Sequence, residues 1–378
     1  MATAARPVPA PGVRLVLRDW RGLDDTDIAR WDALALAAAE PNPFFESWYL
    51  LPSLRALDAD GEVALAVLEG DGEWLGLLQL VREARYYGHP LSHWRGWVHA
   101  NAFLGAPLVA RGHEEPFWRA LLHGLDGMGG GPLFLHLAAL PLGGALHEAL
   151  VDVARTERRP LGLVHREDRA LLASGLAPDA YLESALTGKK RKELRRQFAR
   201  LSEEGVLAVE RRDDADGLAA WTEAFLRLEA SGWKGKAASA LACAPETAAI
   251  FRAALSGAAE RGRLERLALT LDDRPIAMLA SFLTPPGAFS YKTAFDESLA
   301  RFSPGVLLQR ENLALLEREG IAWCDSCAAA DHPMIDHLWR ERRAVGRVSV
   351  AIGGRLRRTA FSLLLAAELG RRPAGVSG

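Results

Sequence analysis

The stretch Asp325-Ser-Cys-Ala-Ala-Ala-Asp-His-Pro-Met-Ile-Asp-His-Leu-Trp339 decides how this chain is interpreted. Two upstream stretches belong with it, Tyr291-Lys-Thr-Ala-Phe-Asp296 and Ser303-Pro-Gly-Val-Leu-Leu308. Together they predict a strand ending in an acid, a Pro-Gly turn that opens a helix, and a second strand whose end carries Asp and His. Because α/β folds place their chemistry in loops beyond strand ends, this region predicts a functional site and not only a core.

Length and composition predict two domains with ample core. The chain has 378 residues, of which 49% are hydrophobic, and 46 Lys and Arg stand against 48 Asp and Glu. This near-neutral balance excludes a general attraction to nucleic acid or anionic lipid. Three cysteines, Cys243, Cys324 and Cys327, are too few for a disulfide framework and indicate a reducing compartment. Without a signal-like segment or an apolar run near 20 residues, we expect a cytoplasmic protein with no membrane span.

The order of predicted elements indicates an α+β (mixed α/β) fold. Each half contains a strand–turn–strand ribbon followed by a helix and a strand, with turns at Gly70-Asp-Gly72 and Asp272-Asp-Arg274. This order suggests a duplicated unit built from mixed, mostly antiparallel sheets flanked by helices. The expected division is a disordered tail over 1–12, an N-terminal domain over 13–175, a C-terminal domain over 176–360 and a C-terminal tail over 361–378.

Ser303-Pro304-Gly305 reads as a helix start after a strand. Pro suits the first helical position and Ser suits the cap, and we expect the helix to run to Glu319. The amide groups and the positive dipole end of such a start suit a phosphate, with Arg301 adding a charge-assisted contact. The alternative is a well-capped helix with no ligand.

Asp325 and His332 are the predicted groups for proton handling, since a carboxylate at a strand end beside a histidine can act as base and orienter. Lys292 and Asp296 are further candidates for orienting an acceptor. We expect no metal site, because Asp336 and His337 are neighbours that point apart on a helix. The structural alternative is that Asp331 caps a helix beginning near Pro333.

Two further segments carry chemistry or simple packing. The helix predicted over 188–205 concentrates seven positive charges between Lys189 and Arg200, which fits either a solvated face or a counter-charge for a polyanion. Trp233 and Lys234 stand in a Gly-rich loop that lines an opening or closes a domain edge. Cys324-Asp-Ser-Cys327 predicts two small, half-buried cysteines around a strand end, not a redox pair or a zinc site.

These motifs resemble those of GNAT-superfamily acyltransferases of the CelD/BcsL type, which are related to FemAB-like tandem-GNAT proteins. The resemblance rests on Glu229-x-x-Gly-Trp-Lys-Gly235 and on the three stretches at 291–296, 303–308 and 325–339. It covers about 185–350. It implies a tandem GNAT fold, acetyl-CoA or another acyl-CoA as donor, and an amine or hydroxyl acceptor, often in envelope or polysaccharide synthesis.

The resemblance also implies roles for particular residues. The phosphate turn would consist of Arg301, Ser303, Pro304, Gly305, Val306 and Leu307. Trp233, Lys234 and Tyr291 would line the substrate opening. The turn departs from the Gly-rich pattern usual for the family. Two other functions stay open: aminoacyl transfer from charged tRNA, with the basic helix as the RNA contact, and a non-catalytic binding module.

Overall fold

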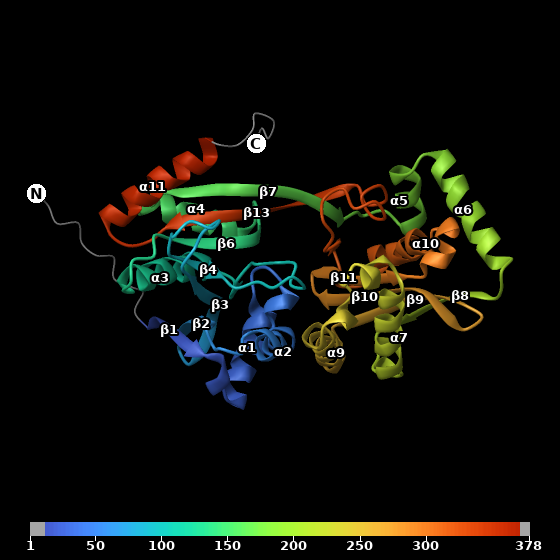
Figure 1. Ribbon diagram of the computed structural model, residues 1–378, viewed down its shortest axis with the longest axis horizontal. Helices are drawn as coiled ribbons and strands as arrows, with labels where there is room; N and C mark the ends of the chain where they lie inside the picture. Colours follow the sequence, from blue (N-terminus) through green and yellow to red (C-terminus); the bar gives the residue numbers. More distant parts are fainter. Residues whose placement is uncertain (1–11, 371–378) are drawn as a thin grey trace, which may run out of the picture. The chain divides into compact units, whose positions relative to one another are not determined.

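The computed structural model describes residues 12–370 and shows a mixed α/β structure (Figure 1). Residues 1–11, where a disordered tail is predicted, and residues 371–378 lie outside the described part. The strands are β1 (Val13–Asp19), β2 (Ala64–Gly70), β3 (Glu73–Glu83), β4 (His93–Gly96), β5 (Leu108–Val109), β6 (Phe134–Pro141), β7 (Leu161–Leu172), β8 (Leu207–Arg212), β9 (Leu264–Leu271), β10 (Arg274–Thr284), β11 (Gly287–Phe295), β12 (Trp323–Asp325) and β13 (Glu341–Ala351). The helices are α1 (Asp25–Ala37), α2 (Ser47–Leu57), α3 (Glu114–Gly127), α4 (Ala145–Thr156), α5 (Pro178–Ala185), α6 (Gly188–Ser202), α7 (Leu218–Ser231), α8 (Trp233–Lys236), α9 (Pro245–Glu260), α10 (Pro304–Glu311) and α11 (Arg355–Gly370).

The chain divides into two compact units that differ from the predicted domain ranges. Unit 1 comprises residues 1–47, 58–167 and 344–378, and unit 2 comprises residues 48–57 and 168–343. The break within β7 falls at Glu167, near the boundary expected from sequence. The sequence pattern did not indicate that 48–57 group with unit 2 or that 344–378 return to unit 1.

The two units share one order of strands and helices. In unit 1, β1, β2, β3 and β4 pair antiparallel in sequence order, and β4 then pairs in parallel with β6. In unit 2, β8, β9, β10 and β11 pair antiparallel in the same way, and β11 then pairs in parallel with β12. Helices separate the first two strands of each series, α1 and α2 in one and α7, α8 and α9 in the other, and another helix precedes the parallel strand. The duplicated topology suggested by the sequence is therefore present, and the mixed α/β class is confirmed.

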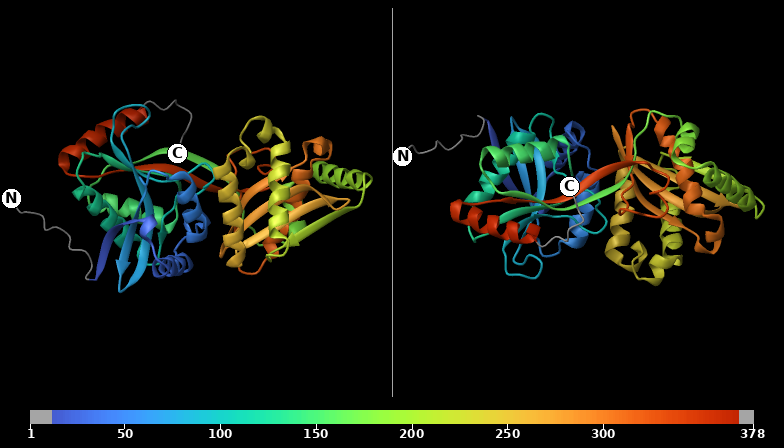
Figure 2. Two further views of the ribbon diagram at one scale, coloured as in Figure 1. Left: turned by 60° about the horizontal axis from the view of Figure 1, so that its bottom comes forward. Right: turned by 90° about the horizontal axis from the view of Figure 1, so that it is seen from above.

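Unit 2 buries both faces of its sheet. Every residue of β9 is buried, as expected for a strand covered on two sides. On one face, α7 and α9 lie side by side across the strands (Figure 2), and Phe225 and Phe251 pack there towards Tyr291. On the other face, side chains of α5, α6 and α10 join Leu267 and Leu269 in one apolar cluster.

Helix α2 packs its unit 2 residues against this core. Trp48 and Tyr49 meet Phe282 edge to face, with ring centroids 4.9 and 5.9 Å away. Gly257 of α9 allows the close approach, because a Cβ added there would lie 2.8 Å from the Trp48 Cβ. An N-terminal segment thereby supplies aromatic groups to the core of unit 2.

Three predictions of local structure are wrong. The residues after 360 are not a tail, since α11 runs to Gly370 and buries Phe361 and Leu365 in unit 1. The helix expected to reach Glu319 ends at Glu311 and continues as a 3-10 helix, where buried Asn312 bonds to the Gln309 side chain.

The third error concerns the segment after Asp331, which forms isolated hydrogen-bonded turns in place of a helix starting near Pro333. The Arg342 guanidinium donates hydrogen bonds to the carbonyls of Asp336 and Trp339. A continuing helix would use these carbonyls as acceptors for its own backbone hydrogen bonds.

A substitution at Gly257 tests the packing of α2 on α9. Gly257→Val is expected to destabilise the protein by about 1–3 kcal/mol, because the new methyl groups overlap Trp48. Ser256→Val, on the exposed side of the same helix, carries the same β-branched cost and should change stability much less. Urea unfolding of both variants measures the difference. Equal losses would show that Gly257 makes no close contact.

Candidate active site

The candidate site begins where β11 and β12 part. Their parallel ladder consists of Gly287 with Trp323, Ala288 with Cys324, and Phe289 with Asp325. Because β12 ends at Asp325 while β11 continues to Phe295, β11 has no β12 partner from Ser290 onward. The backbone of this half of β11 is thus unpaired by β12 on the side facing away from β10.

A β-bulge directs two side chains of β11 together. Ala280 lies opposite Lys292 and Ser281 opposite Ser290, so Tyr291 is the extra residue in the ladder. The Lys292 Nζ accordingly lies 5.8 Å from the centroid of the Tyr291 ring. Bulges commonly re-aim side chains next to functional sites, and this one lies just beyond the end of the ladder between β11 and β12.

Charged groups from three segments meet around Lys292. The Lys234 Nζ donates to Glu229 Oε1 at 2.8 Å, and Glu229 Oε2 accepts from the Leu241 amide at 2.8 Å. Glu229 is a buried carboxylate in the last turn of α7, and the turn of α8 brings Lys234 back to it. The charge on Lys234 is near enough to act on both Lys292 and His332.

Burial and like charge depress the pKa of the basic groups. Burial, reinforced by the charge of Lys234, lowers the pKa of Lys292 to about 8. Burial and the same ammonium also lower the pKa of His332, whose Nδ1 is buried and has no hydrogen-bond partner among the described residues. A neutral amine and a neutral imidazole are the forms that can accept a proton.

Tyr49 closes the wall of this cluster. Its hydroxyl lies 3.2 Å from the Tyr291 hydroxyl, and the rings meet edge to face with centroids 5.7 Å apart. Burial raises the pKa of both phenols, so they stay protonated and can donate hydrogen bonds. The pair forms an aromatic wall next to the Lys292 side chain.

Asp325 is an anchor in this structure, with its carboxylate fully engaged. It is 0% exposed and bonds to Arg169 at 2.6 Å, to Arg343 at 3.0 Å and to the Cys327 amide at 2.9 Å. Burial opposes the charged form, but the two guanidinium groups and the amide lower the pKa of Asp325 below its usual value. A carboxylate in this state is a poor proton acceptor. Lys292 and His332 are therefore better placed than Asp325 for the predicted role of base.

The loop after β12 has a constrained backbone. Cys327 and Asp331 adopt the left-handed region with φ of 53° and 60°, as Ser303 does on the opposite side with φ of 54°. Non-glycine residues in this region store strain that often marks functional sites. Burial raises the pKa of the Cys327 thiol well above its usual value, so Cys327 is not poised as a nucleophile.

The predicted phosphate turn is closed in this structure. Pro304 and Gly305 are buried, and a Cβ at Gly305 would lie 2.2 Å from the Met334 Sδ. The amides of Val306 and Leu307 donate to the Ser303 carbonyl, at 2.9 and 3.0 Å. The Ser303 side chain does not cap the helix as expected, and its Oγ instead accepts from Gln197 at 3.1 Å.

Three other predicted residues have partners or positions outside the Lys292 cluster. Asp296 accepts from the Ser298 amide at 2.9 Å and pairs with Arg274 at 3.1 Å. Arg301, expected to bind phosphate, pairs with Glu204 at 2.9 Å. Trp233 is 58% exposed. The structure therefore brings together Lys234, Tyr291, Lys292 and His332.

Some groups at the site carried no prediction of function. Glu229 opens one of the motifs that carry the family resemblance but was given no role, and Tyr49 belongs to a helix whose apolar stripe explains most of its sequence. Arg169 lies in a strand pattern far from the motifs. A buried acid such as Asp325 needs cationic partners, which is the one signal that points towards Arg169 and Arg343.

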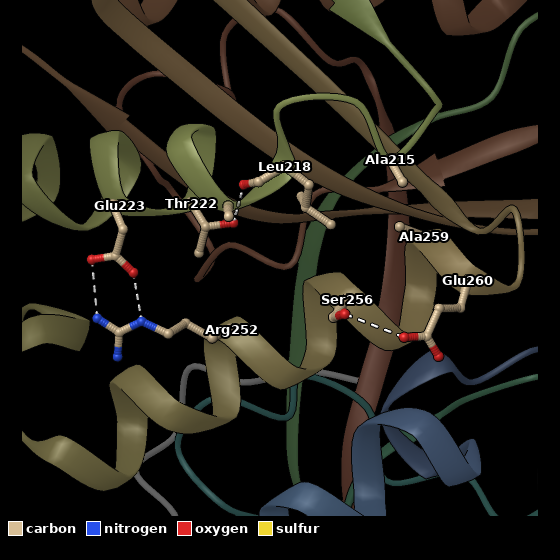
Figure 3. A pocket seen from close by; sticks show the side chains of 9 residues that line it. Ala215, Leu218, Thr222, Glu223, Arg252, Ser256, Ala259 and Glu260 are labelled. Carbon is tan, nitrogen blue, oxygen red and sulfur yellow. Dashed lines mark hydrogen bonds and ion pairs between the residues drawn. The ribbon is translucent and has the colours of Figure 1, made fainter.

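A separate cavity of about 480 Å³ lies between α7 and α9 (Figure 3). Its carboxylates have partners. Glu223 holds Arg252 through two bonds of 2.6 and 3.1 Å, and Glu260 accepts from Ser256 at 3.3 Å. Small side chains such as Ala219 and Ala259 form much of the wall. None of the residues predicted to be functional line this cavity.

Residues 12–370 contain neither a metal-binding cluster nor a membrane-spanning helix. No group of three or more His, Cys, Asp or Glu side chains there is arranged to hold a metal ion. In the same range, no helix combines the length and apolar character needed to cross a bilayer.

Comparison with known proteins agrees with the fold. Residues 188–332 match the family model of an acetyltransferase (GNAT) domain. The crystal structure of FemX aligns at 11% identity with a TM-score of 0.54, covering 89% of this chain and 98% of FemX. A conserved protein of unknown function from Bacteroides thetaiotaomicron aligns at 11% identity with a TM-score of 0.55, covering 89% of this chain and 99% of that one.

A tandem GNAT protein from the clavulanic acid biosynthesis pathway aligns at 18% identity with a TM-score of 0.41, covering 89% of this chain and 98% of that one. A comparison with curated protein sequences finds no match. At these identities, the likeness to FemX and to the Bacteroides protein shows a shared fold, and the domain match over 188–332 falls within unit 2.

Substitution of Asp325 tests its role as an anchor. Asp325→Asn leaves Arg169 buried without its counter-charge, and we expect a loss of about 3–5 kcal/mol in unfolding free energy. Since the folded pKa of Asp325 is depressed, its stabilisation is present above the unfolded pKa and is lost as pH falls through the folded pKa. Glu204→Gln breaks the exposed pair with Arg301 and should cost about 0–1 kcal/mol. Denaturant titration at several pH values compares them, and a small loss for Asp325→Asn would refute the anchor.

Proposed function

We propose that unit 2 transfers an acyl group from an acyl-CoA, such as acetyl-CoA, to an amine or hydroxyl acceptor. The observation that carries this proposal is the position of Lys292, a lysine with a pKa of about 8 on the part of β11 that extends beyond its ladder with β12. The GNAT domain match over 188–332 covers Lys292 and His332. The resemblance of the motifs to CelD/BcsL-type proteins extends the proposal to an acceptor in envelope or polysaccharide synthesis.

In this proposal, Lys292 handles the proton. Its neutral amine accepts a proton from the acceptor nitrogen or oxygen as that atom forms a bond to the thioester carbonyl carbon. The carbon–sulfur bond then breaks, and the Lys292 ammonium returns the proton to the departing thiolate, which leaves as a thiol. His332 is the second candidate base, and the Tyr49–Tyr291 pair keeps water away from the reacting groups.

The donor is expected to lie along the half of β11 that does not pair with β12, with its phosphates near the start of α10. The first turn of α10 contains no acidic residue, whereas the corresponding helix of unit 1, α3, begins with Glu114 and Glu115. Carboxylates at a helix start repel a phosphate, so unit 2 is the better donor site. Met334 would have to move from Gly305 for a phosphate to reach this turn.

The three free cysteines agree with a reducing compartment, and we place the reaction in the cytoplasm. We propose no metal cofactor, because direct acyl transfer requires positioning and a base of suitable pKa.

Donor binding tests the first half of the proposal. Acetyl-CoA, or a longer acyl-CoA, should bind by calorimetry and raise the melting temperature, since a ligand that binds only the folded protein stabilises it. Met334→Ala should bind the donor at least as tightly as the unchanged protein, because it removes the side chain that covers Gly305. Failure of acetyl-CoA and long-chain acyl-CoAs alike to bind would exclude this donor class.

Lys292→Met separates catalysis from stability. Loss of the base should lower the transfer rate by about 10²–10⁴-fold. The folded pKa of Lys292 lies below its unfolded value, so the charged lysine destabilises the fold at pH 7, and this cost falls as pH rises above 8. Methionine should therefore stabilise the protein at pH 7 by on the order of 1–3 kcal/mol. Lys192→Met, at an exposed position of α6, is the matched control. A variant that is stable and fully active would remove Lys292 from the mechanism.

The pH dependence tests the influence of Lys234. The transfer rate should rise as pH passes about 8 and then level off, because only neutral Lys292 accepts a proton. Lys234→Met removes a neighbouring positive charge, so the pKa of Lys292 should rise and the profile should move to higher pH. Lys234→Arg keeps the charge and should leave the midpoint near its original value. An unchanged midpoint in Lys234→Met would contradict the coupling.

A second function, aminoacyl transfer from charged tRNA, is favoured by the basic face of α6. Among its seven cations, Arg196 alone pairs with a carboxylate of the described residues, Glu193 at 2.7 Å. tRNA binding that weakens steeply with salt, and that is lost when Lys190, Arg191 and Arg195 are changed to Glu, would support this alternative. The third possibility, a binding module without catalysis, predicts that Lys292→Met leaves every function of the protein intact.

A further inference from the structure

A second cleft on unit 2 has the character of an anion site. It has a volume of about 510 Å³, within the range of small-molecule sites, and lies between the start of α6 and the segment 336–342. Lys190, Arg340 and Arg342 line it, together with His337. The only acid in its wall is Asp336, so positive charge dominates.

Among the residues that the structure describes, two of these cations have no carboxylate partner. Arg342 pairs with Asp336 at 2.8 Å. The Arg340 guanidinium donates to the Ala185 carbonyl at 3.1 Å, which fixes its position without cancelling its charge. Lys190 has no carboxylate partner among the residues the structure describes. Cations held close together without counter-charges repel one another, and a bound anion relieves this repulsion.

The architecture also favours a phosphate group. Helix α6 is 15 residues long, and Thr187 at its cap is part of the cleft wall, so the positive end of its dipole acts on the same space. A guanidinium and an ammonium that converge from separate segments can contact different oxygens of one phosphate or diphosphate. The Leu186 side chain adds an apolar wall beside them.

One loop connects this cleft to the candidate active site. The amides of Ile335 and Asp336 donate to the His332 carbonyl, at 3.1 and 2.9 Å. His332 therefore stands at one end of a short turn whose other end, Asp336, helps form the cleft. A ligand held by Arg340 and Lys190 would order the same turn that carries His332.

We propose that this cleft binds a phosphate or diphosphate group of a substrate of unit 2. This inference rests on the proposed acyl transfer for its biological meaning, but the binding event itself does not require catalysis. The phosphate belongs either to the acyl donor or to an acceptor such as a nucleoside diphosphate derivative, and both present the same chemistry to the cleft.

Calorimetry with inorganic pyrophosphate tests the site directly. Lys190→Ala and Arg340→Ala should each weaken pyrophosphate binding by about tenfold or more, since each removes a charge-assisted contact. Lys192→Ala and Arg196→Ala remove the same charge from α6 outside the cleft and should change the dissociation constant by less than about twofold. Equal weakening in all four variants would show diffuse attraction to a basic helix and would overturn the proposal, as would no binding of pyrophosphate.

Coenzyme A and UDP identify the source of the phosphate. If Lys190→Ala and Arg340→Ala weaken coenzyme A, the cleft holds part of the donor, and if they weaken UDP alone, it holds the acceptor. Either result supports the site, whereas binding of both that is insensitive to both substitutions contradicts it. These measurements need no turnover, so the two proposals can fail separately. If the unchanged protein transfers no acyl group but binds pyrophosphate through Lys190 and Arg340, the proposed reaction fails and the cleft stands. If it transfers acyl groups but does not bind pyrophosphate, the cleft alone fails.

Discussion

The ion pairs of Asp325 with Arg169 and Arg343 are the constraint on which the candidate site depends. They bind the end of β12 to β7 and β13 inside the core of unit 2, where an unpaired charge would be costly. The third bond of Asp325, from the Cys327 amide, turns the chain sharply out of the strand. The position of every group in the loop after β12, His332 included, starts from this turn.

Ending β12 early has a direct consequence for β11. A longer β12 would extend its ladder with β11 towards Phe295. Three ladder pairs are enough to fix the parallel register, and the bulge at Tyr291 and the Lys292 side chain lie on the part of β11 beyond this ladder. The bonds that hold Asp325 at the end of β12 and the proposed role of Lys292 therefore both depend on the length of β12.

The sequence could predict the elements and most of the motifs but not their partners. The strand patterns and turn residues around 264–295 determine the ribbon and the following helix locally, so these predictions are confirmed. The return of 344–378 to unit 1 and the grouping of 48–57 with unit 2 depend on tertiary contacts, such as Trp48 on Gly257, that leave no local pattern.

The same limit applied to the site. Motif spacing singled out Lys234, Tyr291, Lys292 and His332, which do come together, because strand ends and loops gather polar residues in this class of fold. It could not show that the Asp325 carboxylate forms ion pairs with two arginines, since Arg169 lies 156 positions earlier in the chain. Nor could it show that Met334 covers Gly305. Met334 lies in turns at 331–338 where a helix was predicted. The Arg342 guanidinium donates to the carbonyls of Asp336 and Trp339, and this contact leaves no local pattern in the sequence.

The two units share one topology but differ in the charged groups that the proposed reaction needs. Both units have the same strand order, and each has a helix that starts after the antiparallel series. In unit 1 that helix begins with two glutamates, which stabilise its dipole and make the helix start unsuitable for an anion. In unit 2 the equivalent helix has no acid in its first turn, and the neighbouring strand carries a lysine that is neutral over part of the physiological pH range. Fold alone therefore does not assign activity to both halves. The charges at the helix start and the lowered pKa of one lysine favour unit 2.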